Sequence, residues 1–225
     1  MKFKFGNNLT GQEIYYGNYL LPEQIENKVA IDVGSNVGLF VMENYNKFDN
    51  LYSIEASYEN FLTTLRKVLH KNLKFNEAEN VSCFNLAAAK NTGEVIKIYA
   101  HDSNGNSVSP MTIPDMFSKQ YGAWKEENER YHNVLTISLE GMYEFFNIDY
   151  IDYLKVDIEG AEFDFLLGKD LSRIGCLALE LHGTLGQEMK NEMKQHLEKY
   201  FNVYHVEYDL PAPQHSVITY INKEL

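Results

Sequence analysis

Short runs of apolar residues alternate along the chain with segments in which apolar residues recur every three or four positions. Runs of the first kind are typical of buried β-strands, and spacing of the second kind is typical of amphipathic helices. Strands are expected at residues 28–33, 50–56, 81–87, 151–158 and 176–181, with helices at 39–48, 58–71 and 187–200. This alternation predicts an α/β fold with a largely parallel sheet and helices on both of its faces.

Two more apolar runs close the chain, at residues 202–208 and 216–222. The connection between them is too short for the crossover of a dozen or more residues that parallel neighbours need, so these strands are expected to pair antiparallel. Residues 94–100 alternate in polarity like a further, half-exposed strand. The sequence thus predicts an open, mostly parallel sheet with one antiparallel strand near the C-terminus.

The chain of 225 residues shows no repeat and no linker rich in Pro, Gly or Ser, and it therefore predicts a single domain. We expect this domain to span residues 28–225, with residues 1–27 forming an N-terminal extension packed on it. Residues 103–130 fit no strand or helix pattern and contain the only tryptophan. An insertion of this kind is either a lid over a binding site or a disordered surface excursion, and the sequence leaves both open.

Composition and charge narrow the class of protein. Apolar residues make up 44% of the chain and charged residues 23%, which is typical of a globular protein and excludes a disordered or fibrous one. Lys and Arg number 20 against 32 Asp and Glu, and the net charge of −12 disfavours nucleic acid and anionic membranes as partners. Cys83 and Cys176 lie in apolar runs and are expected in the core. The chain has neither a membrane-length apolar stretch nor a signal-peptide pattern, so we expect a cytoplasmic protein.

The turn after the first strand has the features of a nucleoside-binding site. Gly34 allows a sharp turn off the strand, and Gly38 allows the next helix to pack closely. Glu55 ends the second strand about 20 residues downstream, where an acidic residue binds the ribose hydroxyls of a cofactor. Asn36 replaces the middle glycine of dinucleotide-binding turns, and Asp32 would repel a pyrophosphate. These two residues favour a cationic cofactor that carries an amino group.

The runs VAIDVGSNVG, SIEAS, FNLAAAKNTGE and LKVDIEGAEFDFLLG resemble the FkbM family of S-adenosylmethionine-dependent methyltransferases over residues 29–182. The resemblance implies a Rossmann-like domain with a seven-stranded sheet, S-adenosyl-L-methionine as cofactor and S-adenosyl-L-homocysteine as product. It also implies a cofactor-binding set of Asp32, Gly34, Ser35, Asn36, Gly38, Glu55, Ala56, Asn85, Leu86 and Asp157. One departure is Ser138-Leu139-Glu140, where the family often has Thr-Leu-Asp, and the role of Glu140 stays open.

Three residues near the expected carboxyl ends of the central strands are candidates for catalysis. Asp157 and Glu159 follow one buried strand and His182 follows the next, so all three are expected at the ligand-binding edge of the sheet. His182 titrates near neutral pH, as a general base should, and Asp157 is the other candidate base. Lys155 is expected to pair with a carboxylate within the sheet. Glu162 fits a structural role in the first turn of a helix as well as a functional one.

The resemblance predicts an S-adenosylmethionine-dependent methyltransferase that O-methylates a hydroxyl of a sugar, glycan or other polyhydroxylated metabolite. Its partner would then be a small-molecule or glycan acceptor, without nucleic acid or membrane. A nicotinamide-dependent oxidoreductase and a non-catalytic protein that retains the fold are the alternatives. No metal is expected. Asp157, Glu180 and His182 could together bind a divalent ion, but this is a minority hypothesis because their spacing is not that of a metal motif.

Overall fold

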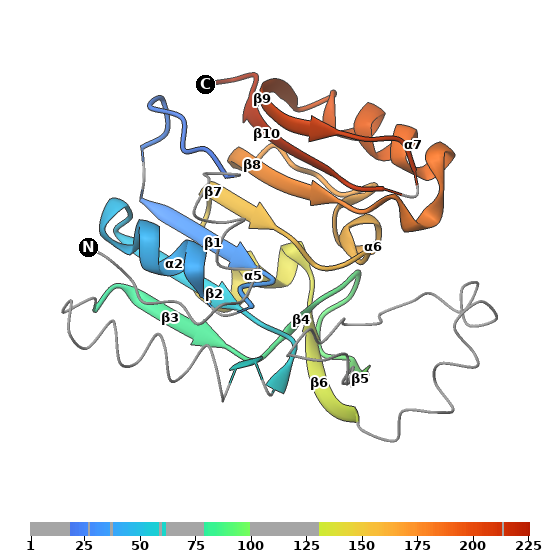
Figure 1. Ribbon diagram of the computed structural model, residues 1–225. Coiled ribbons are helices and arrows are strands. Elements are labelled where there is room, and N and C mark those ends of the chain that lie inside the picture. Colours follow the sequence, from blue (N-terminus) through green and yellow to red (C-terminus); the bar gives the residue numbers. More distant parts are fainter. Residues whose placement is uncertain are drawn as a thin grey trace, which may run out of the picture.

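A mixed β-sheet forms the centre of the fold (Figure 1). The computed structural model describes residues 19–26, 28–36, 38–58, 60–61, 79–99, 131–212 and 214–225. The strand order of the main sheet is β3-β2-β1-β7-β8-β10-β9. The strands are β1 Val29–Val33, β2 Asn50–Ile54, β3 Val81–Phe84, β7 Ile151–Val156, β8 Ile174–Leu181, β9 Phe201–Asp209 and β10 Ser216–Asn222.

The pairing of these strands agrees with the prediction from sequence. Neighbours among β3, β2, β1, β7 and β8 are parallel. Strand β10 runs antiparallel to both β8 and β9, because the short connection after β9 leaves room only for a hairpin. The carboxyl ends of β1, β2 and β7 therefore meet at the same edge, where ligands bind in open α/β sheets.

A second, three-stranded sheet was not predicted. It has the order β4-β6-β5, with β4 Ala87–Ala88, β5 Val95–Tyr99 and β6 Tyr131–Ile137. The expected single strand at 81–87 is wrong in extent, since its first part pairs with β2 and its last residue belongs to β4. Strand β6 has no clear apolar alternation because Leu135, although apolar, lies on the same exposed side as Asn133.

Helices cover both faces of the main sheet, as expected. Helix α2, Leu39–Asn44, packs against Ala30, Leu51 and Tyr153 on one face. The opposite face packs against three helices: α5 Leu139–Phe146, α6 Glu162–Leu166 and α7 Gln187–Leu197. The two faces are distinct because successive side chains of a strand point to opposite sides.

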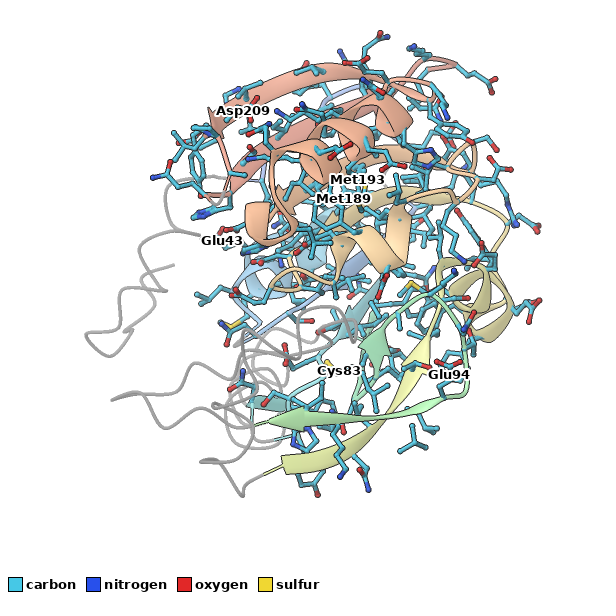
Figure 2. The ribbon with its side chains drawn as sticks, turned by 90° about the vertical axis from the view of Figure 1, so that its right-hand side faces the viewer. Glu43, Cys83, Glu94, Met189, Met193 and Asp209 are labelled. Atoms are coloured by element: carbon cyan, nitrogen blue, oxygen red, sulfur yellow. The ribbon has the colours of Figure 1, made fainter. Side chains whose placement is uncertain are left out.

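Helix α7 illustrates how the core is formed. Its Met189 and Met193 lie on the side that faces the rest of the domain (Figure 2). Met193 and Phe165 of α6 are both fully buried, and burial of such a side chain stabilises the fold by about 2 kcal/mol. Among the described residues, no helix has both the length and the apolar character to cross a bilayer.

Residues 138–140, where the chain departs from the family pattern, form the start of α5. Ser138 caps α5 by accepting a hydrogen bond from Gly141 N at 3.1 Å, and Glu140 in the first turn pairs with Lys169 at 2.9 Å. Glu140 therefore belongs to the scaffold of the domain.

Two short 3₁₀ helices complete the described elements, η1 Tyr45–Lys47 and η4 Gly183–Leu185.

The last part of the N-terminal extension packs on the domain. Ile25 is buried among the residues beneath α2, and the hydroxyl of Tyr153 donates to Leu20 O at 3.1 Å. The expected insertion at 103–130, most of the expected helix at 58–71 and the first 18 residues lie outside the described residues.

Candidate functional site

The turn after β1 requires glycine at residue 34. Gly34 has a φ of 77°, in the left-handed region, and a Cβ there would lie 1.7 Å from Asp157 O. Its N–H donates to Ile54 O at 2.9 Å, so the turn is tied to the end of β2. The close approach of the two backbones leaves bare main chain at the edge of the sheet, as the Gly-containing sequence predicted.

Ser35 and Gly38 help to hold the shape of this turn. Ser35 is buried, and its Oγ donates at 3.1 Å to Asp32 O or at 3.0 Å to Ile54 O. Gly38 has a φ of 74° at the start of α2. Asn36 between them is also left-handed, with a φ of 47°, a conformation that asparagine adopts more readily than most residues. The turn thus holds its shape through main-chain geometry and one buried hydroxyl.

Glu55 fixes the other side of the turn. One carboxylate oxygen accepts from Asn36 N and the other from Ser57 N, both at 2.7 Å. Burial raises the pKa of Glu55 to about 7, although these two hydrogen bonds favour the charged form. Each oxygen keeps a further lone pair, so the carboxylate can still accept hydrogen bonds from a ligand.

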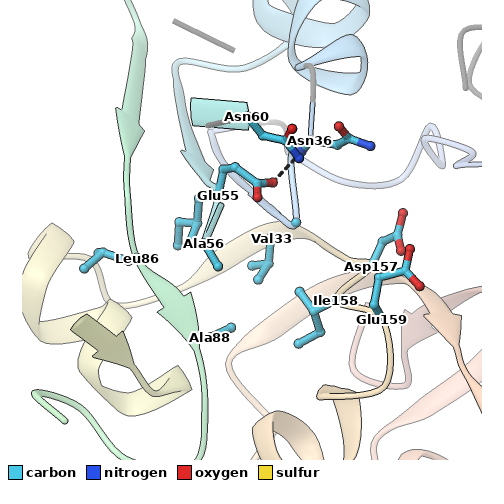
Figure 3. A pocket seen from close by; sticks show the side chains of 12 residues that line it. Val33, Asn36, Glu55, Ala56, Asn60, Leu86, Ala88, Asp157, Ile158 and Glu159 are labelled. Atoms are coloured by element: carbon cyan, nitrogen blue, oxygen red, sulfur yellow. Dashed lines mark hydrogen bonds between the residues drawn. The ribbon is translucent and has the colours of Figure 1, made fainter. Parts of the chain in front are cut away.

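A pocket that opens to solvent lies between this turn and the end of β7. Figure 3 shows polar side chains on two of its sides, Asn36, Glu55 and Asn60 on one and Asp157 and Glu159 on another. The full lining comprises Val33, Gly34, Asn36, Ile54, Glu55, Ala56, Asn60, Leu86, Ala88, Asp157, Ile158 and Glu159. An apolar floor between two polar sides is typical of a cofactor site.

The lining includes part of the predicted cofactor-binding set. The predicted residues that line the pocket are Gly34, Asn36, Glu55, Ala56, Leu86 and Asp157. The apolar floor and one amide were not predicted from the sequence; these residues are Val33, Ile54, Asn60, Ala88 and Ile158. Most of these are strand ends or residues just after them, so the rule that ligands bind beyond the carboxyl ends of strands could have found them.

Four predicted cofactor residues do not line the pocket: Asp32, Ser35, Gly38 and Asn85. Asp32 is fully buried and pairs with Lys155 at 2.9 Å, as the prediction for Lys155 required. Asn85 Nδ2 donates to the carbonyl oxygens of Glu55 and Ala56 at 2.9 and 3.1 Å. These residues hold the strand ends in place around the pocket.

Lys155 links β1 to the end of β7. Besides Asp32, its Nζ donates to Gly34 O at 3.1 Å and lies 3.9 Å from Asp157 Oδ2. Burial alone would lower the pKa of this lysine, but the charges of Asp32 and Asp157 outweigh burial and raise it. Lys155 is therefore a permanent cation that neutralises Asp32 within the sheet.

The predicted catalytic carboxylates lie where β7 ends. Asp157 N donates to Val33 O at 3.0 Å, which continues the pairing of β7 with β1, and the side chain of Asp157 is 27% exposed at the pocket. Glu159 has a left-handed φ of 56° and Gly160 a φ of 105°. This turn presents both carboxylates at the edge of the sheet.

His182 lies in a cluster of carboxylates beside the pocket. Its Nδ1 is 2.9 Å from Glu162 Oε1, while its Nε2 is 3.4 Å from Glu159 Oε2 and 3.7 Å from Glu180 Oε1. Glu162 is fully buried and also accepts from the N–H groups of Ile158 and Gly160. The structural alternative for Glu162 therefore holds, since this carboxylate orients both the turn after β7 and the imidazole.

These carboxylates determine the charge of His182. Burial alone would lower its pKa, but the hydrogen bond to Glu162 and the charges of Glu162, Glu159 and Glu180 raise it to about 10. An imidazolium has no free lone pair for a proton. The surroundings of His182 therefore favour a charge-balancing role over the general base expected from the sequence, and Asp157 is the candidate base that lines the pocket.

Asp157, Glu180 and His182 come close enough for the minority metal hypothesis to be examined. One potential ligand atom from each lies within 4.8 Å of the others. However, the imidazole already pairs with Glu162, and Tyr19 OH lies 3.1 Å from Asp157 Oδ2 and 3.0 Å from Glu180 Oε2. Protons on His182 and Tyr19 thus already bridge the carboxylates, and we assign no ion here.

Comparisons with known proteins show which family the chain is similar to. The family profile for the Methyltransferase FkbM domain matches residues 32–204, whereas no curated protein matches the sequence. Among solved structures, methyltransferase FkbM from Methylobacillus flagellatus KT is 16% identical, with a TM-score of 0.49 over 89% of this chain and 45% of that one. A dimethyladenosine transferase from Plasmodium falciparum is 9% identical, with a TM-score of 0.50 over 96% of this chain and 62% of that one.

M. capricolum TrmK, solved with S-adenosyl-homocysteine, is 12% identical, with a TM-score of 0.44 over 96% of this chain and 69% of that one. The chain thus spans less than half the length of the FkbM structure. Family membership rests on the profile match over residues 32–204, most of the 225-residue chain. The chain therefore belongs to the FkbM family of methyltransferases.

Proposed function

We propose that the protein transfers a methyl group from S-adenosylmethionine to a hydroxyl of a sugar, a glycan or another polyhydroxylated metabolite. The observation that carries this proposal is the pocket bounded by Gly34, Glu55 and Asp157 in a chain of this family. The nicotinamide alternative has less support, because Asn36 takes the place of the middle glycine of a pyrophosphate-binding turn.

The residues of the pocket fit S-adenosylmethionine. Glu55 has lone pairs for two ribose hydroxyls, and Leu86, Ala88 and Ile158 offer apolar surface for a base. Gly34 packs directly against the backbone of Asp157, and its main chain lines the pocket without a side chain. The bound cofactor would supply a methyl group on a cationic sulfonium, and the charge of Asp157 and Glu159 suits a cation on that side of the pocket.

Asp157 is the residue that we assign as the base. It lines the pocket, where it can accept the proton of an acceptor hydroxyl, whereas His182 is held as an imidazolium. Lys155, at 3.9 Å from Asp157 Oδ2, stabilises the carboxylate while it is ionised. The remaining task of the chain is alignment, since holding two reactants in a reactive geometry contributes several kcal/mol, about 7 or more in favourable cases.

The charge around the base favours an acceptor without phosphate. Glu159, Glu162 and Glu180 lie near Asp157, and the basic side chains that contact these carboxylates among the described residues are Lys155, His182 and His215. A neutral polyhydroxylated acceptor can donate hydrogen bonds to carboxylates, whereas a phosphate would be repelled. The net charge of −12 supports the same choice over RNA.

Mass spectrometry tests the proposed acceptor class. Neutral oligosaccharides, nucleotide sugars and RNA are incubated separately with the protein and S-adenosylmethionine. We expect a gain of one methylene in a neutral polyhydroxylated compound, at a position shown to be a hydroxyl. Methylation of RNA alone, or of a nitrogen atom, would contradict the proposal.

A further inference from the structure

Tyr19 brings a hydroxyl from the N-terminal extension into the carboxylate cluster. Its OH lies 3.1 Å from Asp157 Oδ2 and 3.0 Å from Glu180 Oε2, so a single hydroxyl bridges the ends of β7 and β8. No local pattern in the sequence indicates this contact, because the residues are 138 and 161 positions apart. Tyr19 does not line the cofactor pocket, but it touches the carboxylate that we assign as the base.

The ring of Tyr19 is held in a defined position. It packs edge-on against Phe40, with ring centroids 6.4 Å apart, and Lys155 Nζ lies 5.1 Å from its centroid. The following residue is anchored by the hydrogen bond from Tyr153 OH to Leu20 O. The position of the hydroxyl is therefore set by packing on two sides and by an anchor in the next residue.

A count of protons shows what the bridge requires. A phenol donates one hydrogen bond, so it can serve only one of two ionised carboxylates, and the second contact needs a proton on the other group. Burial raises the pKa of Glu180 to about 7, and the charge of Asp157 adds to this rise. Burial and the same two carboxylates raise the pKa of Tyr19 well above its ordinary value. Near neutral pH, Glu180 is therefore about half protonated, and the proton that the second contact needs can lie on its carboxyl group.

The chain of contacts continues from Glu180 toward solvent. Glu180 Oε1 lies 3.3 Å from His215 Nε2, and the side chain of His215 is 43% exposed. The charged groups that face the bridge come from several elements: Lys155 on β7, Glu159 after β7, His182 after β8 and His215 before β10. The bridge thus connects the pocket with the surface through a continuous set of polar groups.

We propose that Tyr19 is a positioning residue of the methyl transfer: its hydroxyl aligns Asp157 as the base and relays the proton from Asp157 to Glu180. The inference rests on the proposed function. The acceptor O–H bond breaks as an O–H bond forms on Asp157. The proton of Asp157 then passes to the phenol oxygen while the phenol proton passes to Glu180, and Glu180 releases its proton to His215 or water. The phenol is restored, and one proton has left the site.

The first test replaces Tyr19 by Phe, which keeps the ring and removes the hydroxyl. Carbon-13 NMR of the carboxyl groups follows the titration of Glu180 in the protein without cofactor. In the wild type, we expect a midpoint near 7, where the pKa of Glu180 lies. The midpoint should rise in Tyr19→Phe, because the lost hydrogen bond stabilised the carboxylate. An unchanged midpoint would overturn the inference.

The second readout is kinetic and uses the acceptor identified by mass spectrometry. Tyr19→Phe should lower kcat about 10-fold or more and shift its pH profile, with the KM for S-adenosylmethionine changed less than about twofold. Tyr153→Phe is the matched control, because it removes the hydroxyl that anchors the same segment at Leu20 O. It should change the Glu180 midpoint and the pH profile less than Tyr19→Phe does, because the hydroxyl of Tyr19 and the packing of its ring remain. Equal effects of the two variants would show that docking of the segment matters instead, and would overturn the relay.

A second variant keeps the test decisive if Tyr19→Phe does not fold. Glu180→Gln retains the tyrosine and removes the group that receives the proton, so it should show the same loss of kcat. A methylating enzyme whose Glu180→Gln variant keeps its kcat and pH profile overturns the relay alone. Absence of methylation of every acceptor overturns the proposed function and, with it, the relay.

Discussion

The two sides of the site are stabilised in different ways. The side formed by β1 and β2 depends on main-chain geometry, with Gly34 in a left-handed turn and Glu55 bound to two backbone N–H groups. The side formed by β7 and β8 depends on side chains, with Asp157, Glu180 and His182 sharing protons and charge. The first side is thus held by hydrogen bonds to the main chain, while the second is held by contacts among ionisable side chains. This contrast fits cofactor binding on one side and proton transfer on the other.

The largest effect is expected from Gly34→Ala. The added Cβ would lie 1.7 Å from Asp157 O, so the two strand ends must move apart. Both residues line the pocket, so we expect the affinity for S-adenosylhomocysteine to fall about 100-fold or more, measured by calorimetry. A misplacement of about 1 Å in an active site can lower a rate by about the same factor.

Gly168→Ala is the control for this change, because Gly168 has a nearly equal φ of 78° and open space around its Cβ position. Gly168→Ala should lower the free energy of unfolding by only about 1 kcal/mol, because of backbone strain, and should still bind S-adenosylhomocysteine. Equal loss of binding in both variants would show that strain, rather than close approach of the strands, explains the effect.

Glu55→Gln tests the carboxylate on the main-chain side. The amide has one acceptor oxygen, so one of the hydrogen bonds from Asn36 N and Ser57 N is lost together with the charge. Affinity for S-adenosylhomocysteine should fall about 10- to 100-fold, because hydrogen bonds to charged groups contribute about 1.5–3 kcal/mol. Glu140→Gln, which changes a carboxylate that pairs with Lys169 and does not line the pocket, should bind normally. Normal binding of S-adenosylhomocysteine by Glu55→Gln would show that Glu55 does not bind the cofactor.

Glu162→Gln tests the side of the site formed by β7 and β8, through its effect on the free energy of unfolding. The pKa of His182 is raised to about 10 in the folded protein, so the folded state binds its proton more tightly than the unfolded state. The resulting stabilisation is complete below the ordinary pKa of about 6.5 and is lost as the pH rises through the folded pKa. Glu162→Gln should therefore destabilise the protein by about 1–2 kcal/mol at pH 6 and by less near pH 10, measured by thermal unfolding.

Glu192→Gln, at an exposed position of α7, serves as the control and should show no such pH dependence. A destabilisation by Glu162→Gln that stays constant over this range would mean that His182 does not carry the predicted charge.

The smallest effect is expected from removal of divalent ions. Protons on Tyr19 and His182 already bridge the carboxylates of the cluster, so a chelator should change the methylation rate by less than about twofold. Added Mg²⁺ should likewise leave the melting temperature unchanged. A melting temperature that rises with Mg²⁺ concentration would support the minority metal hypothesis instead.

The sequence predicted the main-chain side better than the side-chain side, for a physical reason. Gly34 and Glu55 belong to one strand-turn-helix-strand unit, and their spacing is a local property. Strand alternation also predicted that Lys155 pairs with a carboxylate in the sheet, which its contact with Asp32 confirms. Such patterns depend on backbone periodicity and persist without knowledge of distant contacts.

The protonation of the cluster could not be predicted in this way. Tyr19 reaches Asp157 from 138 residues away, and Glu162 turns back from α6 to bind His182. The expectation that His182 acts as a base assumed an ordinary pKa, which these partners change. Strand β6 was missed for a related reason, since Leu135 lies on an exposed side of a small sheet and obscures the alternation.

Calorimetry with S-adenosylhomocysteine tests the central claim most directly, namely that the pocket between Gly34, Glu55 and Asp157 binds the methyl-donor cofactor. We predict that the wild type and Gly168→Ala bind S-adenosylhomocysteine one-to-one and that Gly34→Ala shows no measurable binding. None of them should bind NAD. Binding of NAD alone, or unchanged binding of S-adenosylhomocysteine by Gly34→Ala, would contradict it.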